Sequence, residues 1–307
     1  MKKLIFLIFA VFVIIFSCSK SDATDNLPMD GNVGVYKNRT IINNLTGTKG
    51  TYALPPLTAT NHVNVPQLIK ELKQLNANSY NWLIWKTGKE WEDLKVFLPV
   101  AAAENIKVWI TIVPPSESEP VMEFSSQPYR MDYKRWATEI AKLSVEHPNL
   151  VAWSIDDFAV NNNLSTFTPS YMKLLKDVTK KINPDLAFIP CIYYADVSED
   201  FAKRYGNYFD GILFPFFAQS TDSNLHDVTP LYAEINKFKK TFKDSIPIIV
   251  DVYSHTVGFA DHEITTPQYV KAMITESRKY ADGVKVYCHQ DSLLDPDKFN
   301  AIKTGFE

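Results

Sequence analysis

Short apolar runs alternate with amphipathic stretches along most of this 307-residue chain. The apolar runs are rich in β-branched and aromatic residues, which is typical of buried strands. We expect strands at residues 50–54, 78–85, 106–113, 149–156, 186–194, 209–217, 246–253 and 282–289. Residues 32–38 (NVGVYKN) are an alternative first strand.

Each expected strand is followed by a segment with apolar residues at helical spacing. These segments are residues 65–76, 91–105, 132–147, 169–182, 198–208, 229–242, 266–280 and 295–305. Three of them begin with a threonine before a proline, at Thr168, Thr229 and Thr266. A capping hydroxyl followed by a proline at the first helical position is typical of a helix start.

Eight strand–helix units without a tight hairpin predict a (β/α)8 TIM barrel, an α/β fold, as a single domain over residues 32–307. A doubly wound sheet is the alternative. That fold would place a glycine-rich turn after the first strand, but residues 55–65 read PPLTATNHVNV. The pattern therefore favours the barrel.

The N-terminus has the pattern of an export signal, because two lysines precede an uninterrupted apolar run in MKKLIFLIFAVFVIIFSC. The ending IFSC resembles the lipobox of bacterial lipoproteins. This resemblance implies a signal peptide at residues 1–17, lipidation of Cys18 and a flexible tether at residues 18–31. The protein is then expected in the cell envelope, anchored by acyl chains to a bacterial membrane, on the periplasmic or surface face of the outer membrane. An ordinary cleaved signal with a chance cysteine is the alternative.

The charge balance excludes some partners. The chain has 32 basic and 35 acidic residues, and loss of the two N-terminal lysines would make its net charge of −3 more negative. A mildly acidic chain with no basic run argues against nucleic acid as a partner and leaves the lipid anchor as the expected membrane contact. Cys191 and Cys288 lie in apolar runs and are expected to be buried thiols. A monomer is assumed.

Catalytic groups of a TIM barrel lie at the C-terminal ends of the strands, where alternate residues point inward. On the expected fourth strand, the apolar set Val151, Trp153 and Ile155 faces the helices. Asp156 then points toward the barrel axis, and Asp157 begins the following loop. We predict Asp156 as a catalytic carboxylate with Asp157 beside it in the same site.

Polar side chains share the inward parity at the ends of three later strands. They are Tyr194 and Asp196 after the fifth strand, Asp251, Tyr253 and His255 on and after the seventh, and Lys285, Tyr287, His289 and Asp291 on and after the eighth. We predict Asp251 as the second catalytic carboxylate and the others as substrate-binding residues. Because a buried charge needs a partner, the alternative is that Lys285 neutralises Asp251 or Asp156 in a structural polar core.

Aromatic side chains near the same strand ends suit a flat ligand that is rich in hydroxyl groups. They are Trp85, Tyr194, Phe216, Phe217, Tyr253 and Tyr287. Trp85 and Tyr194 lie nearest the rim and are predicted to contact substrate. The long loop at residues 113–132 carries Glu117, Glu119 and Glu123, which alternate with serines and prolines and are expected to be solvated.

The segment HPNLVAWSIDDF (147–158) resembles the fourth-strand pattern of barrel glycoside hydrolases that carry one catalytic carboxylate after strand four and another on strand seven. Asp251 lies where the second carboxylate is expected. The resemblance implies hydrolysis of a glycan or oligosaccharide by carboxylate acid/base chemistry. Matched on Trp153, however, the glutamate of that family falls on Phe158, so the adjacent aspartates must take its role. The alternative is a non-catalytic carbohydrate-binding surface lipoprotein.

Other barrel chemistries fit the sequence less well, and we predict no cofactor and no metal. A metal-dependent hydrolase would carry a His-x-His motif on an early strand, but the six histidines are scattered. A Schiff-base lysine needs apolar or cationic surroundings, and the expected neighbours of Lys285 are anionic. The loops after the last two strands lack the glycines of a phosphate cradle.

Overall fold

Eight parallel strands form the centre of the structure, a computed structural model that describes residues 38–255, 265–289 and 291–307. The strands are β1 Thr48–Tyr52, β2 Ser79–Ile84, β3 Lys107–Ile112, β4 Leu150–Ile155, β5 Ala187–Phe188, β6 Ile212–Phe216, β7 Ile248–Tyr253 and β8 Gly283–Tyr287. Their order, β5-β4-β3-β2-β1-β8-β7-β6, follows the chain around a ring. Two 3.0 Å backbone hydrogen bonds, from Ile192 N to Leu213 O and from Leu213 N to Pro190 O, join the ends of the sheet. The predicted (β/α)8 barrel is confirmed.

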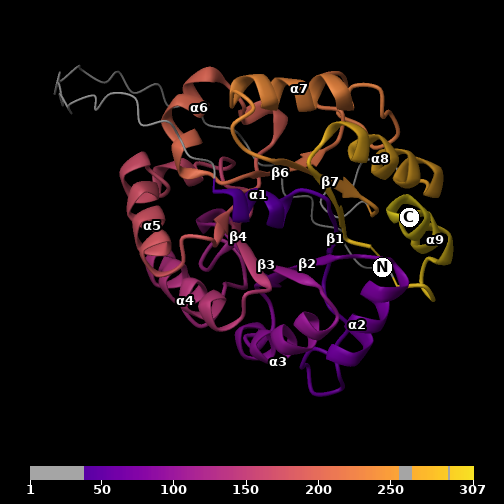
Figure 1. The fold of residues 1–307 in the computed structure, drawn as a ribbon, viewed down its shortest axis with the longest axis horizontal. Coiled ribbons are helices and arrows are strands. Elements are labelled where there is room, and N and C mark those ends of the chain that lie inside the picture. Colours follow the sequence, from indigo (N-terminus) through magenta and orange to yellow (C-terminus); the bar gives the residue numbers. More distant parts are fainter. Residues whose placement is uncertain (1–37, 256–264, 290) are drawn as a thin grey trace, which may run out of the picture. The chain divides into compact units, whose positions relative to one another are not determined.

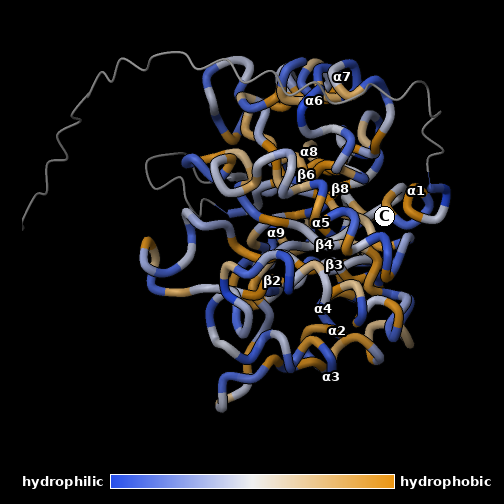
Figure 2. Tube along the Cα trace, turned by 90° about the vertical axis from the view of Figure 1, so that its left-hand side faces the viewer, coloured by the Kyte–Doolittle hydropathy of each residue, from blue (hydrophilic) through white to orange (hydrophobic). Residues whose placement is uncertain are grey.

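A helix follows each strand and packs outside the sheet, so that the helices surround the strands (Figure 1). These helices are α2 Val65–Gln74, α3 Glu90–Ala103, α4 Tyr133–Glu146, α5 Pro169–Ile182, α6 Glu199–Tyr205, α7 Leu231–Thr241, α8 Pro267–Tyr280 and α9 Pro296–Phe306. A view turned by 90° places the strands between α6 and α7 on one side and α2 and α3 on the other (Figure 2). All the predicted helices are present, with ends that differ from expectation by a few residues.

A helix that the sequence pattern did not predict, α1 Arg39–Leu45, precedes β1. Asn38 caps this helix, because its Oδ1 accepts a hydrogen bond from the backbone N–H of the second helical residue at 3.0 Å. Ile41 and Leu45 are buried among the side chains inside the barrel. Lys107 Nζ, at the start of β3, also donates to backbone carbonyls of the helix. Helix α1 therefore covers the N-terminal end of the barrel.

Two of the three predicted threonine caps are confirmed. Thr168 Oγ1 accepts from Tyr171 N at 3.3 Å, and Thr266 Oγ1 accepts from Tyr269 N at 3.1 Å. The prediction for Thr229 was wrong, because α7 begins one residue later, after Pro230, without a side-chain cap. The hydroxyl of Thr229 instead donates to an aspartate earlier in the same loop, at 3.0 Å.

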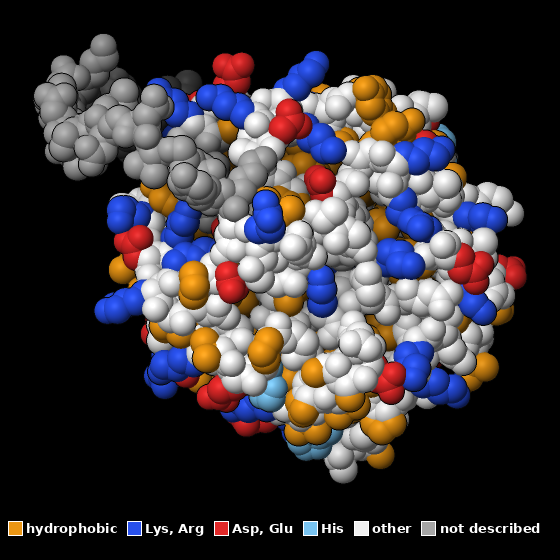
Figure 3. Space-filling view, in the orientation of Figure 1, with side chains coloured by type: hydrophobic (Ala, Val, Ile, Leu, Met, Phe, Trp, Pro, Cys, Tyr) orange, Lys and Arg blue, Asp and Glu red, His pale blue; other side chains and the backbone are white. Residues whose placement is uncertain are grey.

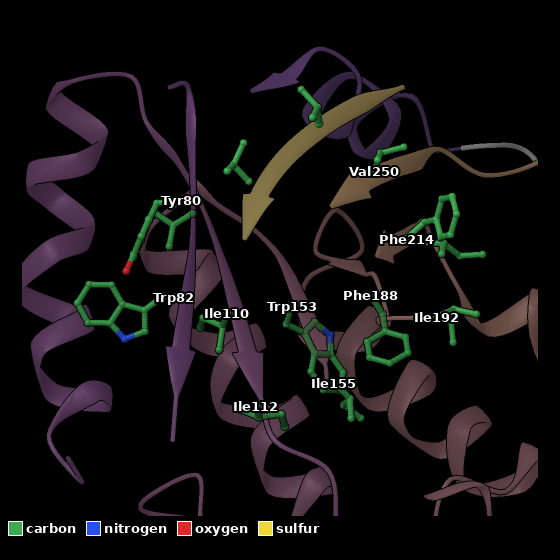
Figure 4. Packing of buried hydrophobic residues seen from close by; sticks show 14 of the residues in the cluster. Tyr80, Trp82, Ile110, Ile112, Trp153, Ile155, Phe188, Ile192, Phe214 and Val250 are labelled. Atoms are coloured by element: carbon green, nitrogen blue, oxygen red, sulfur yellow. The ribbon is translucent and has the colours of Figure 1, made fainter. Parts of the chain in front are cut away.

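The main hydrophobic core lies between the strands and the helices. Tyr80 and Trp82 point from β2 toward this layer, and Trp153 of β4 packs against Phe188 of β5 with ring centroids 4.6 Å apart (Figure 4). Trp153 and Ile155 thus face the helices, as predicted. The prediction for Val151 was wrong, because a bulge between β3 and β4 turns this side chain into the barrel interior.

The predicted signal peptide at residues 1–17, the lipidation of Cys18 and the tether at residues 18–31 lie outside the described residues. The same holds for residues 32–37 of the alternative first strand. Within the described ranges no helix has the length and apolar character needed to cross a bilayer. On the face shown in Figure 3, acidic and basic side chains are interspersed rather than gathered into a tract of one sign.

Candidate active site

Asp156 and Asp157 follow β4 directly at the C-terminal end of the barrel. The backbone N–H of Asp157 donates to Asp156 Oδ1 at 3.1 Å. Asp157 has a left-handed backbone, with φ of 39°, so the chain turns sharply after the strand. The two carboxyl groups and the thiol of Cys191 consequently lie with their reactive atoms within 4.8 Å of one another. The prediction that both aspartates belong to one cluster at the strand end agrees with this geometry.

A tyrosine hydroxyl holds each of the two carboxyl groups. Tyr52, at the end of β1, donates to Asp156 Oδ2. Tyr193, in the extended segment after β5, donates to Asp157 Oδ1 at 2.7 Å. Both hydrogen bonds favour the ionised carboxylates, but burial opposes ionisation more strongly. Burial and, next, the charge of Asp157 raise the pKa of Asp156 to about 6, and burial also raises the pKa of Asp157.

Glu117 is a third carboxyl group in this cluster. It ends a 3-10 turn, Pro115–Glu117, that follows β3. The buried side chain of Asn163 attaches this turn to the aspartates, because its Nδ2 donates to Asp157 O at 2.8 Å and to Ser116 Oγ at 2.9 Å. Burial and then the charges of Asp156 and Asp157 raise the pKa of Glu117 to about 8.

The prediction that all the loop acids are solvated was therefore wrong for Glu117. It was correct for Glu123, which is exposed. Glu119 is also exposed and lies 3.5 Å from Arg130 Nη1 as a surface ion pair. The alternation of acids, serines and prolines does not distinguish these three glutamates. Glu117 is buried because Asn163, far along the chain, attaches its turn to the aspartates.

Asp251 and Lys285 lie inside the barrel as neighbours on β7 and β8. Asp251 is 3% exposed and Lys285 is fully buried. Burial raises the pKa of Asp251 to about 8; the charge of Lys285 opposes this rise and that of Asp156 adds to it. Lys285 Nζ has no hydrogen-bond partner in the described part of the chain and lies 3.8 Å from the centroid of the Trp109 ring. The inward direction predicted for Lys285 is confirmed, and its side chain is buried inside the barrel.

A cavity of about 360 Å³ opens beside the carboxyl cluster, at the ends of β1, β2 and β8. Four predicted substrate-binding residues line it together: Trp85, Tyr287, His289 and Asp291. Tyr52 forms part of the same wall, with its ring 5.1 Å from that of Tyr287, and its hydroxyl reaches Asp156. Tyr52 thus connects the cavity to the carboxyl cluster, and sequence reasoning missed it.

The remaining predicted ligand contacts lie elsewhere. Tyr253 is 5% exposed and packs edge-to-face against Tyr287, with centroids 5.3 Å apart. Asp196 is half-buried within electrostatic reach of Asp157. Tyr194 is directed toward helix α7, where the Nζ of a lysine lies 3.8 Å from its ring centroid. His255 is the last described residue before a gap, and its Nδ1 has no hydrogen-bond partner among the described residues.

The inward parity predicted for the fifth strand was wrong by one residue. Ala187 and Ile189 face the barrel interior and Phe188 faces the helices, so the odd positions point inward. Tyr193, rather than Tyr194, therefore reaches the carboxyl cluster. The large aromatic side chain at position 188 was the available signal, because the outer layer beneath the helices accommodates bulky residues on every neighbouring strand.

Phe158, the position matched to the glutamate of glycoside hydrolases, is buried in the outer core. Its ring stacks on that of Phe167 at 5.1 Å between centroids and contacts Phe209 edge-to-face at 5.5 Å. It does not line the cavity among the described residues. A carboxyl group at position 158 would lie in an aromatic cluster, so any acid in this chain must come from a different position.

Asp156, Asp157 and Cys191 are the described residues with spacing suited to a metal ion. Both oxygens of Asp156 and one oxygen of Asp157 already take part in hydrogen bonds. Burial raises the pKa of the Cys191 thiol, which keeps it protonated and a poor metal ligand. The arrangement suits proton transfer between carboxyl groups better than metal binding.

Burial of the Asp156 charge predicts a pH-dependent cost in stability. The pKa of Asp156 is about 6 in the folded protein and about 4 in an unfolded chain. Between these values the folded state binds more protons, so the contribution of Asp156 to stability is present below about pH 4 and is lost as pH rises through about 6. Compared with Asp156→Asn, the wild type is expected to lose on the order of 2 kcal/mol of unfolding free energy between about pH 4 and about pH 7.

Urea denaturation of both proteins at the two pH values measures this difference. Titration of His289 largely cancels between the two proteins, whereas Glu117 and Asp251, whose pKa values the charge of Asp156 raises, add to the difference in the same direction. A difference that stays constant with pH would show that Asp156 is already ionised at about pH 4.

No protein-family model matches the sequence, and no curated protein sequence matches it. Solved structures with a similar fold include a glucosidase from Croceicoccus marinus, with a TM-score of 0.62 and 10% identity over 85% of this chain and 67% of that one. A GH2 β-galacturonidase from Eisenbergiella tayi, bound to galacturonate, has a TM-score of 0.57 and 13% identity. A β-glucuronidase from an uncultured Clostridium has a TM-score of 0.55 and 14% identity. This chain covers 51% and 50% of the last two proteins. At these identities the likeness shows a shared barrel fold.

Proposed function

We propose that this protein hydrolyses a glycosidic bond in a carbohydrate. The observation that carries the proposal is the group of three carboxyl side chains, Glu117, Asp156 and Asp157, at the C-terminal mouth of the barrel beside an aromatic-lined cavity. The C-terminal mouth is where TIM-barrel enzymes place their catalytic groups. The likeness in fold to a glucosidase, a galacturonidase and a glucuronidase supports the same reaction class.

Glycoside hydrolysis requires one protonated and one ionised carboxyl group. The cluster supplies both near neutral pH, because the pKa values of Glu117 and Asp156 are about 8 and about 6. We assign the proton to Glu117, which donates it to the leaving oxygen as the bond from the anomeric carbon breaks. Asp156, ionised and oriented by Tyr52, attacks that carbon or takes a proton from the attacking water.

Asp157 influences the reaction through its charge, whereas Asp251 is largely uncharged near neutral pH. Asp157 lies beside Asp156 and raises its pKa, and its own carboxyl group is positioned by Tyr193. Asp251 lies inside the barrel, where burial raises its own pKa to about 8, so near neutral pH it is largely uncharged and adds little repulsion to the carboxylates of the cluster. The cavity walls Trp85 and Tyr287 offer aromatic surfaces to the sugar ring.

Glu117→Gln tests whether Glu117 is the general acid, because its effect should depend on whether the leaving group needs a proton. With a methyl glycoside, whose leaving group needs a proton, kcat is expected to fall by about 10²-fold or more. With the 4-nitrophenyl glycoside of the same sugar, the loss is expected to be much smaller, because 4-nitrophenolate leaves without protonation. Release of sugar and of 4-nitrophenol across a panel of such glycosides measures both.

Glu123→Gln is the matched control, since Glu123 lies in the same loop but is exposed. It is expected to leave both rates unchanged. Equal losses with the two leaving groups in Glu117→Gln would contradict the role of Glu117 as the acid.

A further inference from the structure

The cavity beside the carboxyl cluster has an acidic set of ionisable groups. Its described walls include Glu71 from α2 and Asp291 from the loop after β8, and they include no lysine or arginine. His289 is 9% exposed, and burial lowers its pKa to about 4, so the imidazole is uncharged near neutral pH. Asp156 adds further negative charge behind Tyr52. The lysine inside the barrel, Lys285, is fully buried and is not part of the cavity wall.

Two buried polar atoms in the cavity wall have no hydrogen-bond partner among the described residues. They are Nδ1 of His289 and Nε1 of Trp85. Buried polar atoms in native proteins are normally paired, so the side chains of Trp85 and His289 keep hydrogen-bonding capacity in this wall that no other described residue uses. The indole N–H is a donor, and a neutral imidazole offers one donor and one acceptor, which matches hydroxyl groups.

Glu71 lies in the cavity wall, where its carboxyl group would interact electrostatically with a charged ligand. It is 6% exposed, and its Oε1 accepts from Gln67 Nε2 at 2.8 Å. Burial raises the pKa of Glu71, and the charge of Asp291 raises it further, so the two carboxyl groups already repel each other. A ligand carboxylate would add a third negative charge without a cation in the described wall to receive it.

We infer that this cavity is a sugar subsite that takes an uncharged or amino-bearing sugar ring and rejects uronic acids. The inference rests on the proposed function for its ligand class and goes beyond it in naming the charge of the sugar. Trp85 and Tyr287 contact the ring faces, His289 and Trp85 hydrogen-bond to hydroxyl groups, and Glu71 with Asp291 excludes carboxylates. A volume of about 360 Å³ is at the lower end for ligand pockets, which suits a small number of sugar units.

A glycan array that carries neutral, amino and uronic-acid glycans tests the inference on the purified full-length chain in a non-glycosidic detergent. The glycans bound are expected to be neutral or amino glycans. The tightest neutral glycan is then compared, by isothermal titration calorimetry, with the same glycan oxidised at C6 to a uronate. The oxidised form is expected to bind about tenfold more weakly or worse. Trp85→Ala is expected to lower the affinity for the neutral glycan by at least about tenfold.

Glu71→Gln removes one charge with little change in shape. It is expected to reduce the ratio between the affinities for the neutral glycan and for its oxidised form severalfold. Glu92→Gln, on the exposed face of α3, is the control and is expected to leave this ratio unchanged. Binding of uronic-acid glycans alone, equal affinity for the two probes, or no glycan binding at all would overturn the inference. Because binding is measured without turnover, glycan binding with no hydrolysis would refute the proposed reaction and leave the subsite assignment standing.

Discussion

Asp156→Asn is expected to lower glycoside hydrolysis by about 10³-fold or more, with both good and poor leaving groups. The substitution keeps an oxygen that can accept from Tyr52 but removes the charge that attacks the anomeric carbon or activates water. It differs in this from Glu117→Gln, whose effect depends on the leaving group. The rates are measured with the same methyl and 4-nitrophenyl glycosides.

The affinity of Asp156→Asn for its glycan is expected to stay within about threefold of the wild type, because the lost charge acts in the transition state and Asp156 is not one of the residues that line the sugar-binding cavity. Asp177→Asn, an exposed residue on α5 that pairs with Lys173, is the control for aspartate replacement. A variant that hydrolyses both substrates at the wild-type rate would remove Asp156 from the mechanism.

Phe158→Glu is expected to lower the free energy of unfolding by about 4 kcal/mol or more. The new carboxyl group would replace a fully buried ring that stacks on Phe167 and would have to lie in an aromatic cluster. Because small and medium-sized domains have a total stability of about 5–15 kcal/mol, much of this variant is expected to be unfolded. Urea denaturation followed by tryptophan fluorescence measures the loss.

Phe158→Leu retains an apolar side chain of similar size and is expected to cost about 1–2 kcal/mol, which separates loss of packing from burial of a charge. A Phe158→Glu protein that is stable and hydrolyses glycosides faster than the wild type would contradict the burial of position 158 in the aromatic core. In that case position 158 would face the active site, as the sequence match to glycoside hydrolases implies.

The barrel could be predicted from the sequence because its strands and helices repeat one local pattern. Each strand is a short apolar run and each following helix is amphipathic, so the periodicities identify both. Helix α1 could not be predicted in this way. It is short, RTIINNL has little helical propensity, and its formation depends on burial of Ile41 and Leu45 in the end of the barrel.

The candidate site was predictable where strand geometry is regular. Asp156 continues the inward parity of β4. The same parity at and beyond the end of β8 identifies three residues of the cavity wall, Tyr287, His289 and Asp291. Tyr193 was missed because the short strand β5 gave a weak parity signal around Pro190. Glu117 was missed because its place beside the aspartates depends on Asn163, a contact between two loops that no local pattern encodes.

The most direct test of the proposed reaction is the release of reducing sugar by the wild-type protein from the glycans that it binds. Release from at least one bound glycan, with a loss of about 10³-fold in Asp156→Asn, is the expected result. Glycan binding with no release by the wild type would contradict hydrolysis and would identify a carbohydrate-binding barrel instead.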